Sequence, residues 1–379
     1  MNTYLIKAFT VFVLILNCSC RNYKGSSYTT TADILESIES NKDDKFVFQN
    51  SATLLSFVPT VERLKLSLDY VRIGMYNYPI DSLYLPENVG RTNAIDYILG
   101  ESENHSILIL NEAHHVPEHR DFARKLLKGL WENGYRHIGI ETLGNLVDTK
   151  KLKFPTYDLG YYSVEPTFGN FIREALAIGF EIFPYEHISE GSGNPREIGQ
   201  AKNIVEYMNS KESGKVFIYC GYDHNKEGEL PRWGKAMAGR LYEYLGIDPL
   251  TVDQTQFYGV RNTNEEEPFI LIDNDKPYDQ LGTQRDLYVI NPIKNFTERL
   301  EWKANSSNSW LKLNNEHFPE KPCLVRVYCN KSEVKNGIPY DVVEITSSHE
   351  HTWCIVPNNE SYVIYADVDG KLKDVSDKY

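Results

Sequence analysis

The sequence lacks the motifs that identify two large groups of proteins. No glycine-rich phosphate loop, Walker motif or nucleotide-binding fingerprint occurs in its 379 residues, so nothing predicts a nucleotide site. It also has no CxxC pair and no histidine and cysteine cluster with the spacing of structural zinc ligands, which excludes a zinc finger. Positive charge is scarce, with 40 Lys and Arg against 53 Asp and Glu and a formal net charge of −13. This balance argues against sequence-independent binding to nucleic acid or to anionic lipid headgroups, because like charges repel.

What is present is the composition of an ordinary globular protein, with 41% hydrophobic and 25% charged residues. This composition excludes a disordered chain, a collagen and a helical membrane bundle. Since a domain has roughly 150 residues, the length indicates two domains, or one large domain with an appendage.

The first residues have the features of a targeting signal. Lys7 precedes the apolar run 8–16, which has the length of a signal-peptide core and is too short to span a bilayer as a helix. We therefore expect residues 1–19 to be removed and the mature protein to leave the cytoplasm.

A cysteine directly after such a run resembles the lipobox of bacterial lipoproteins. Ser19 before Cys20 favours Cys20 over Cys18 as the lipidated residue. We expect residues 20–31 to form a polar tether and the protein to be anchored by lipid to the bacterial membrane, at its periplasmic face or at the cell surface. The alternative is an ordinary secretory signal with incidental cysteines.

Four further cysteines lie later in the chain, at Cys220, Cys323, Cys329 and Cys354. An oxidising compartment permits disulfides, and the last three lie in one β-rich stretch, so we expect one pair among them. The connectivity stays open. Cys220 is expected to be a small buried residue at a strand end rather than a nucleophile.

Short apolar runs alternate with amphipathic stretches over residues 104–255. The expected strands are 106–110, 137–140, 181–185, 215–219 and 250–252, and the expected helices are 117–130, 168–177, 196–208 and 232–245. Five strands separated by four helices are βαβ units, whose right-handed crossovers make a sheet parallel. We predict an α/β domain over 32–290, with an open, mostly parallel sheet, flanking helices and helical decoration at its N-terminus.

Ionisable or polar residues follow each expected strand. They are Glu112 and His115, Glu141, Glu186 and His187, Asp223 and His224, and Asp253. Ligands bind at the carboxyl ends of the strands in open parallel sheets, so we expect these side chains to converge in one crevice. For any single position, the alternative is a loop side chain that faces water.

Several motifs occur in an order that known families share. They are Asn-Glu-Ala-His-His-Val-Pro-Glu-His at 111–119, Arg124, Ile-Gly-Ile-Glu at 138–141, Arg-Glu-x-x-Gln-Ala at 196–201 and Cys-Gly-Tyr-Asp-His at 220–224. Together they resemble the superfamily that joins ChaN-like haem-uptake proteins, TraB/Tiki proteases and erythromycin-esterase-like hydrolases. The resemblance covers residues 104–255.

The chain departs from these families at informative positions. Asn111 stands where they usually have glycine, and adjacent His114 and His115 make the register ambiguous. His115-Val-Pro fits the Tiki-type Gly-Thr-x-His-Val-Pro, which favours His115. The esterase-like branch has two histidines in its second motif, whereas this chain has His224 alone there.

The resemblance implies hydrolysis of an ester or amide bond in a small molecule or peptide. In the esterase-like mechanism His115 is the general base that takes a proton from water. Glu112 or Glu141 would orient its ring, and Arg124 would hold the carboxylates or stabilise an oxyanion. His224 would complete the catalytic set.

Three further residues, Glu186, Tyr222 and Asp223, are expected to contact the substrate. In a second, metal-dependent mechanism, which the Tiki branch implies, His115, His224 and Glu112 bind a divalent ion such as manganese, cobalt or zinc.

The haem-binding branch offers a non-enzymatic alternative, in which Tyr219 or Tyr222 contacts haem. A degenerate scaffold without chemistry is a further alternative.

Some of these residues also have a purely structural interpretation. Arg124 is equally explained by a buried ion pair with a strand-end glutamate, and His114 by capping the start of the helix. His119 and Arg120 are expected on the surface of the first helical turn.

The alternation of expected strands and helices does not continue into residues 291–379. Apolar alternation at 323–328, 340–345, 353–356 and 362–366, with turns at 336–337, 358–359 and 369–370, predicts an antiparallel β module, in the form of a small sandwich. His349, Glu350 and His351 resemble a metal-binding triplet, which we interpret as a loop.

Overall fold

The computed structural model describes residues 28–74, 85–86, 88–144, 148–187, 193–211, 214–231, 233–258, 265–274, 276–278, 284–292, 299–318, 320–346, 351–358 and 361–379. The expected signal peptide, with Cys18 and Cys20, lies outside these residues, as do His349 and Glu350. Among the described residues, no helix is both long enough and apolar enough to cross a lipid bilayer.

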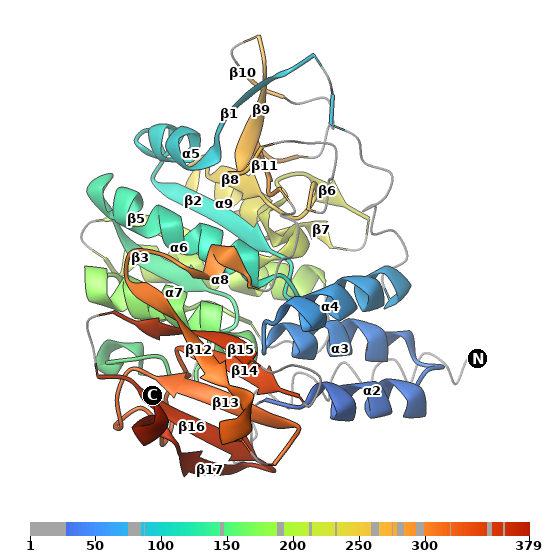
Figure 1. Cartoon of the computed structure of the whole chain (residues 1–379). Coiled ribbons are helices and arrows are strands. Elements are labelled where there is room, and N and C mark those ends of the chain that lie inside the picture. The colour runs from blue at the N-terminus through green and yellow to red at the C-terminus, as the bar shows by residue number, and fades with distance from the viewer. Residues whose placement is uncertain are drawn as a thin grey trace.

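A mixed sheet forms the centre of the fold (Figure 1). Its strand order is β1-β9-β11-β8-β2-β5-β3-β4, and β10 pairs with β9. The strands from β11 to β4 in this order are parallel, whereas β9 is antiparallel to β11, and β1 and β10 are antiparallel to β9. The strands are β1 (Gly90–Asn93), β2 (Ile107–Glu112), β3 (Tyr135–Ile140), β4 (Glu181–Pro184), β5 (Lys215–Gly221), β8 (Leu250–Asp253), β9 (Phe269–Asp273), β10 (Lys276–Pro277) and β11 (Leu287–Ile290). The predicted α/β fold with an open, mostly parallel sheet is confirmed.

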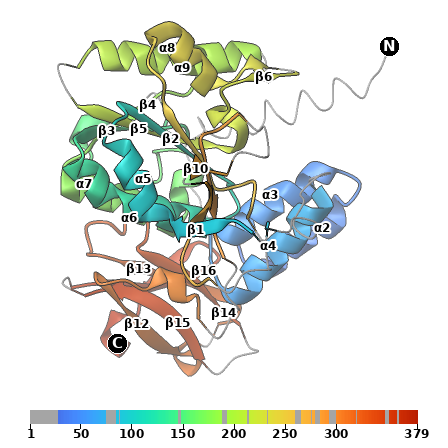
Figure 2. The ribbon, with the colours of Figure 1, turned by 90° about the horizontal axis from the view of Figure 1, so that it is seen from above.

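Helices cover both faces of this sheet (Figure 2). They are α5 (Ala94–Ser102), α6 (Pro117–Glu132), α7 (Pro166–Ile178), α8 (Asn194–Asn209) and α9 (Met237–Leu245). The chain passes from β2 through β3 to β4, and then returns, so that β5 inserts between β2 and β3 and β8 lies beyond β2. Because the crossovers are right-handed, this reversal places α6 and α7 on one face and α8 and α9 on the other.

The sequence of β2 shows why it forms the middle of the sheet. Leu108 and Leu110 belong to the core under α6 and α7, and Ile107 and Ile109 belong to the core under α8 and α9. Successive side chains of a strand point to opposite faces, so a strand covered on both faces is apolar throughout. All four side chains are fully buried.

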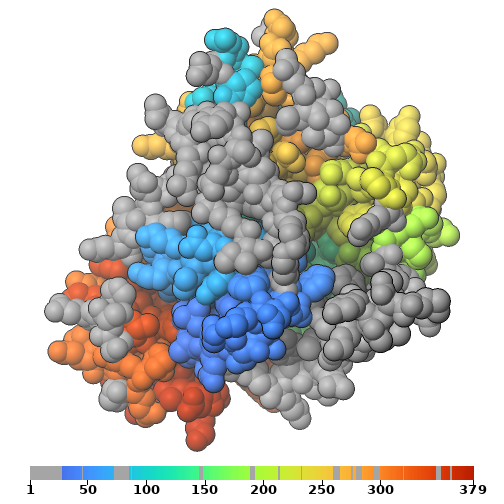
Figure 3. Space-filling view, turned by 90° about the vertical axis from the view of Figure 1, so that its right-hand side faces the viewer, coloured from blue at the N-terminus to red at the C-terminus, as the bar shows by residue number. Residues whose placement is uncertain are grey.

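Three N-terminal helices lie beside the carboxyl ends of the parallel strands (Figure 1). They are α2 (Thr31–Ser40), α3 (Lys45–Ser56) and α4 (Val61–Gly74). Leu68 of α4 packs with Ala113 and Val116, which directly follow β2. Figure 3 views the molecule from this side, where α2 and α3 (blue) border the C-terminal residues (orange to red). The helical decoration predicted before the sheet therefore covers the edge at which the strands end.

The folded part begins before the expected end of the tether at residue 31. Tyr28 is buried, and its hydroxyl donates a hydrogen bond of 2.6 Å to the carbonyl of Val164. Thr31 donates from its backbone to Glu344 at 2.9 Å. Residues 28–31 therefore belong to the packed structure.

The C-terminal part consists of antiparallel sheets, as predicted. A two-stranded sheet pairs β12 with β15, and a four-stranded sheet has the order β14-β13-β16-β17. Its strands are β12 (Asn308–Asn314), β13 (Cys323–Tyr328), β14 (Asp341–Ile345), β15 (His351–Pro357), β16 (Val363–Val368) and β17 (Lys371–Asp374). A small hairpin joins β6 (Glu229–Leu230) and β7 (Gly234–Lys235), and the 3₁₀ turns are η1 (Thr149–Lys151), η2 (Tyr162–Val164), η3 (Tyr222–Asn225), η4 (Glu301–Lys303), η5 (Asn315–His317) and η6 (Ser376–Lys378).

One apolar cluster joins the N-terminal helices, the α/β part and the C-terminal sheets. Its buried members are Tyr28, Phe57, Val58, Val164, Leu324, Ile338 and Val342. Polar contacts reinforce this junction, since Arg173 of α7 lies 2.6 Å from the carboxylate of Glu333. The three parts therefore pack against one another through this shared cluster rather than meeting only at a linker.

The cysteines differ from expectation. Cys323 and Cys354 are buried free thiols. Any pair among the three late cysteines has to include at least one of these two, so the predicted disulfide is absent and that prediction is wrong. Cys220 is also a buried free thiol, and burial raises its pKa, which fits its predicted structural role.

Candidate functional site

The polar residues at the strand ends do converge. Glu112 and Gly221 are neighbours across β2 and β5, and the backbone N–H of Gly221 donates a hydrogen bond of 2.5 Å to Glu141, which follows β3. Glu141 in turn shares Arg196 with Glu186, which follows β4. Carboxylates from neighbouring parallel strands therefore meet at one edge of the sheet, as the sequence predicts.

Arg120 holds the carboxylate of Glu112. Its Nε lies 2.7 Å from Glu112 Oε2 and its Nη2 lies 2.9 Å from Oε1, so the pair is bidentate. The Tyr219 hydroxyl donates to Oε2 at 2.9 Å, and Arg120 Nη1 donates to Glu165, the N-cap of α7, at 3.1 Å. Arg120, Glu112 and Glu165 are almost completely buried, which makes this cluster rigid.

His114 is the histidine that contacts this carboxylate. Its Nδ1 lies 2.9 Å from Glu112 Oε1, and its ring stacks on Tyr162 with centroids 3.7 Å apart. The edge of Tyr222 contacts the same ring at 5.0 Å. A Cβ on Gly221 would come within 2.7 Å of His114 Nε2, so only glycine leaves room for this ring.

The electrostatics fix how protons are distributed in this pair. Burial raises the pKa of Glu112, but Arg120 and the hydrogen bond from His114 outweigh burial and hold that pKa well below its ordinary range. A carboxylate can only accept hydrogen bonds, so His114 Nδ1 carries the donated proton. In the neutral form of the ring, Nε2 bears the lone pair, and 15% of the His114 side chain is exposed to solvent.

A second ion cluster surrounds Arg196 in the first turn of α8. Arg196 Nη2 lies 2.5 Å from Glu141 Oε1 and 2.5 Å from Glu186 Oε2, and Nε lies 3.0 Å from Glu186 Oε1. Burial raises the pKa of Glu141, but His224 and Arg196 lower it to about 2. Glu141 is therefore ionised at neutral pH.

His224 completes this second cluster. Its Nδ1 lies 2.9 Å from Glu197 Oε2, and its Nε2 lies 2.9 Å from Arg196 Nη1, which can only donate. The ring stacks on Trp233 at 5.1 Å. Burial lowers the pKa of His224, but the carboxylates of Glu141 and Glu197 together outweigh burial and raise it. Glu197 also accepts from the backbone N–H of Met237, which connects α8 to the start of α9.

His115 is the histidine that the sequence predicts as the general base. It is buried beside Tyr222, whose hydroxyl lies 3.4 Å from its Nδ1, and its ring meets Tyr258 edge to face. Burial lowers the pKa of His115 to about 3, which makes it a weak base at neutral pH. The contact of His114 with Glu112 favours the Glu112-x-His114 register, and the catalytic role of either histidine stays a prediction.

Arg124 also lies elsewhere. It pairs with Asp121 and Glu174 at 2.8 Å each, on the side of α6 that faces α7, so the expected ion pair with Glu112 or Glu141 is wrong. Arg120, one turn earlier, makes that pair instead. The expectation that His119 and Arg120 lie on the surface is also wrong, because both are fully buried.

Tyr222 and Asp223 belong to the turn η3 that carries His224. Asp223, whose side chain is 45% exposed, pairs with Arg285 at 2.9 Å and with Lys226 at 3.0 Å. Asp253, at the end of β8, is buried and pairs with Arg285 at 3.1 Å. These residues lie around the site, where substrate contact by Tyr222 and Asp223 stays a prediction.

The expected metal set does not fit the arrangement of its residues. Among the residues that the structure describes, no group of three or more His, Cys, Asp or Glu side chains is arranged to hold a metal ion. His224 uses both ring nitrogens for Arg196 and Glu197, and His115 faces Tyr222. Tyr219, considered for haem, is fully buried and bonded to Glu112.

The first turns of the crossover helices supply residues that the sequence analysis did not assign to the site. They are Arg120 of α6, Glu165 at the N-cap of α7, and Arg196 and Glu197 of α8. The sequence did contain a signal for these residues, because each helix that follows a parallel strand begins at the carboxyl edge of the sheet. Charged residues in those first turns were therefore candidates.

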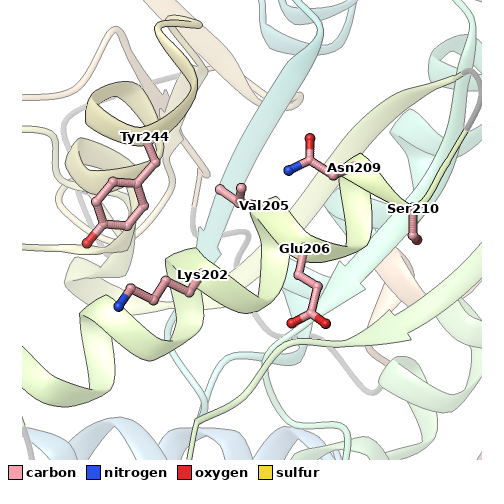
Figure 4. A pocket seen from close by; sticks show the side chains of 6 residues that line it. All are labelled: Lys202, Val205, Glu206, Asn209, Ser210 and Tyr244. Atoms are coloured by element: carbon pink, nitrogen blue, oxygen red, sulfur yellow. The ribbon is translucent and has the colours of Figure 1, made fainter.

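A surface pocket of about 540 Å³ lies away from this cluster (Figure 4). Its lining side chains come from α8 and its C-cap and from Tyr244 of α9; the former are Lys202, Val205, Glu206, Asn209 and Ser210. None of these lining residues is among the strand-end residues described above, so this pocket is not part of the candidate site.

The buried histidine of α6 gives a testable pH dependence of stability. Burial lowers the pKa of His119 to about 3, and its Nδ1 accepts the Ala113 N–H at 3.0 Å. Below about pH 6.5 the unfolded chain binds a proton here that the folded chain does not, so stability falls with falling pH by up to about 1.4 kcal/mol per unit. We expect His119→Asn, whose amide oxygen can still accept, to remove this part of the slope.

The measurement is urea unfolding of both proteins at pH 7.5 and pH 5. The difference in unfolding free energy between variant and wild type should change by about 2 kcal/mol in favour of the variant at pH 5. Taking the difference cancels groups of opposite sign, such as Glu118, whose pKa burial raises to about 7. Parallel stability profiles for the two proteins would contradict a neutral buried His119.

Comparison with solved structures finds distant likenesses, which include bacterial effector and toxin structures. No family model and no curated protein matches the sequence. The type III effector HopBA1 is 9% identical with a TM-score of 0.35, over 57% of this chain and 99% of that one. RRSP, a MARTX toxin effector domain from Vibrio vulnificus CMCP6, is 15% identical with a TM-score of 0.31, over 52% of this chain and 39% of that one. The resemblance to ChaN-like, TraB/Tiki and erythromycin-esterase-like proteins stays a prediction.

Proposed function

We propose that the strand-end cluster is a hydrolytic centre that cleaves an ester or amide bond in a small molecule or peptide. The observation that carries this proposal is the His114–Glu112 pair. Its carboxylate is ionised and held by Arg120 and Tyr219, and its imidazole is oriented with one nitrogen left for a water molecule. This is the arrangement that general-base catalysis requires.

In this mechanism His114 Nε2 takes a proton from water as the water attacks the carbonyl carbon of the substrate. The imidazolium that forms is stabilised by the Glu112 carboxylate, which lies 2.9 Å from Nδ1. Because Glu112 is fixed by two other groups, little reorganisation is needed when charge develops on the ring. The same imidazolium then returns a proton to the leaving group.

Arg196 is positioned to stabilise negative charge on the substrate. A guanidinium has five N–H donors. Four of them serve Glu186, Glu141 and His224, so one Nη1 hydrogen remains available on a side chain that is 22% exposed. We expect it to donate to the oxygen on which charge develops.

The experiment is a hydrolysis screen of the purified mature protein against p-nitrophenyl esters of increasing chain length and against a mixture of unstructured peptides. His114→Asn is the test variant, and His137→Asn, a buried histidine at the opposite end of β3, is the matched control. Turnover by the wild type and the control but not by the test variant supports the proposal. Equal turnover by all three proteins would overturn it.

We also propose that the protein acts outside the cytoplasm as a lipid-anchored protein, on the evidence of the segment up to Cys20. In Cys20→Ala we expect the protein to shift from the membrane fraction to the soluble fraction, since the anchor is lost. Fractionation with immunoblotting, beside Cys18→Ala as the control, measures this. Membrane attachment of the unlipidated Cys20→Ala protein would refute the anchor.

A further inference from the structure

The turn that carries His224 has a strained backbone. Tyr222, the first residue of η3, has φ of 40°, in the left-handed region that side chains other than glycine and asparagine avoid. Such a conformation persists only when surrounding contacts impose it. His224 follows two residues later, so the direction of its ring depends on this turn.

Arg285 makes the contacts that impose the turn. Its Nε donates to Asn225 Oδ1 at 2.8 Å, and its Nη2 donates to the Tyr222 carbonyl at 3.2 Å and to Asp223 Oδ1 at 2.9 Å. One guanidinium thus contacts the first, second and last residues of η3. Its Nη1 lies 3.1 Å from Asp253, which anchors it to the end of β8.

Asn111 supports the same turn from β2. Its Nδ2 donates to the Tyr222 carbonyl at 2.6 Å and to Asp253 Oδ2 at 2.7 Å. Asn111 and Asp253 are fully buried, and the side chain of Arg285 is 1% exposed. The Tyr222 carbonyl therefore accepts hydrogen bonds from two buried side chains, Asn111 in β2 and Arg285 just before β11. These two bonds hold the carbonyl in place.

We propose that Arg285 is a positioning residue of the hydrolytic centre: it fixes the left-handed turn at Tyr222 and thereby sets His224 against Glu141 and Arg196. The proposal rests on the proposed function in one respect, namely that His224 belongs to the centre. Arg285 precedes β11, outside the repeated βα units, and no motif in the sequence connects it to His224.

Trp233 offers a readout of this geometry that needs no substrate. Its indole stacks on His224 at 5.1 Å, and a stacked imidazole changes the emission of an indole. The contribution of Trp233 is the wild-type emission spectrum minus that of Trp233→Phe. In His224→Ala this contribution changes because the partner ring is gone, which calibrates complete loss of stacking.

The test variant is Arg285→Lys, which keeps the charge beside Asp253 but has no planar fork to reach the whole turn. The Trp233 contribution in this variant is its emission spectrum minus that of Arg285→Lys/Trp233→Phe. We expect this contribution to shift to the Trp233 contribution measured in His224→Ala. Free guanidinium at millimolar concentration should restore the wild-type spectrum in Arg285→Ala. Arg326→Lys, which weakens a buried pair with Asp367 in the C-terminal sheets, is the control for general destabilisation.

The outcomes separate the two proposals. An unchanged Trp233 contribution in folded Arg285→Lys, or a change of equal size in Arg326→Lys, overturns the role of Arg285. If Arg285→Lys is poorly folded, the guanidinium rescue of Arg285→Ala decides instead, and absence of rescue overturns it. On a substrate that the wild type hydrolyses, we expect kcat to fall in Arg285→Lys with KM unchanged. A shifted spectrum with unchanged kcat would support the positioning of His224 and remove His224 from the catalytic machinery.

Discussion

In His114→Asn we expect kcat/KM to fall by about 10²–10⁴-fold on any ester or amide that the wild type hydrolyses, since this is the usual contribution of a positioned general base. Asparagine retains a polar group that can donate to Glu112, so the buried carboxylate keeps a partner and the fold should persist. It has no basic nitrogen, so the proton of the attacking water has no acceptor. Steady-state hydrolysis measures the loss, and circular dichroism checks that the variant is folded.

The neighbouring histidine provides the control. His115→Asn changes a buried ring whose pKa burial lowers to about 3, so we expect activity to stay within about tenfold of the wild type once the folded fraction is taken into account. The reverse result, with activity lost in His115→Asn and kept in His114→Asn, would restore the Tiki-like register and refute the role given to His114.

A second large effect is expected on stability. Arg120→Met removes the cation shared by Glu112 and Glu165 and leaves two buried carboxylates without their counter-ion. Breaking a buried ion pair in this way typically costs about 3–5 kcal/mol, because the remaining charge is neither paired nor hydrated. This is a large part of a typical total stability of roughly 5–15 kcal/mol. Urea unfolding at pH 7 measures it.

Arg124→Met is the matched control, because it removes the same type of side chain one helical turn later. Of its two partners, Glu174 is 38% exposed, so water can solvate its carboxylate, and the buried Asp121 keeps Lys125 as a counter-ion at 3.0 Å. We expect a loss of about 1 kcal/mol or less, as for ion pairs near the surface. If Arg120→Met fails to fold, the double variant Glu112→Gln/Arg120→Met serves instead. It removes one of the two unpaired charges, so it should recover part of the stability. Equal losses in the two single variants would contradict the buried network.

The contrast between these two arginines shows where sequence reasoning reached its limit. Arg120 and Arg124 are four residues apart, so they lie on the same side of α6, about 6 Å apart along its axis. Only the one at the strand end reaches Glu112. The helical period predicts the face but not the distance to the carboxylate, which depends on how α6 sits on the sheet.

The adjacent histidines show the same limit on a smaller scale. Both follow β2 within three residues, and the sequence alone leaves open which of the two spacings from Glu112 is used. The backbone after β2 decides which ring contacts the carboxylate. That path is set by contacts from far along the chain, including Tyr162 against His114 and Tyr258 against His115.

The sequence by itself determined the alternation of strands and helices over residues 104–255, because bare apolar runs and helical periodicity are local properties of the chain. It also determined that polar side chains gather at one edge, since parallel strands all end there. Only the tertiary structure decided that β5 inserts between β2 and β3, that the first turns of α6 and α8 supply Arg120 and Arg196, and that Arg285 holds the turn of His224. Such contacts join residues far apart in the chain, and their geometry is set by the packing of whole elements rather than by any local pattern.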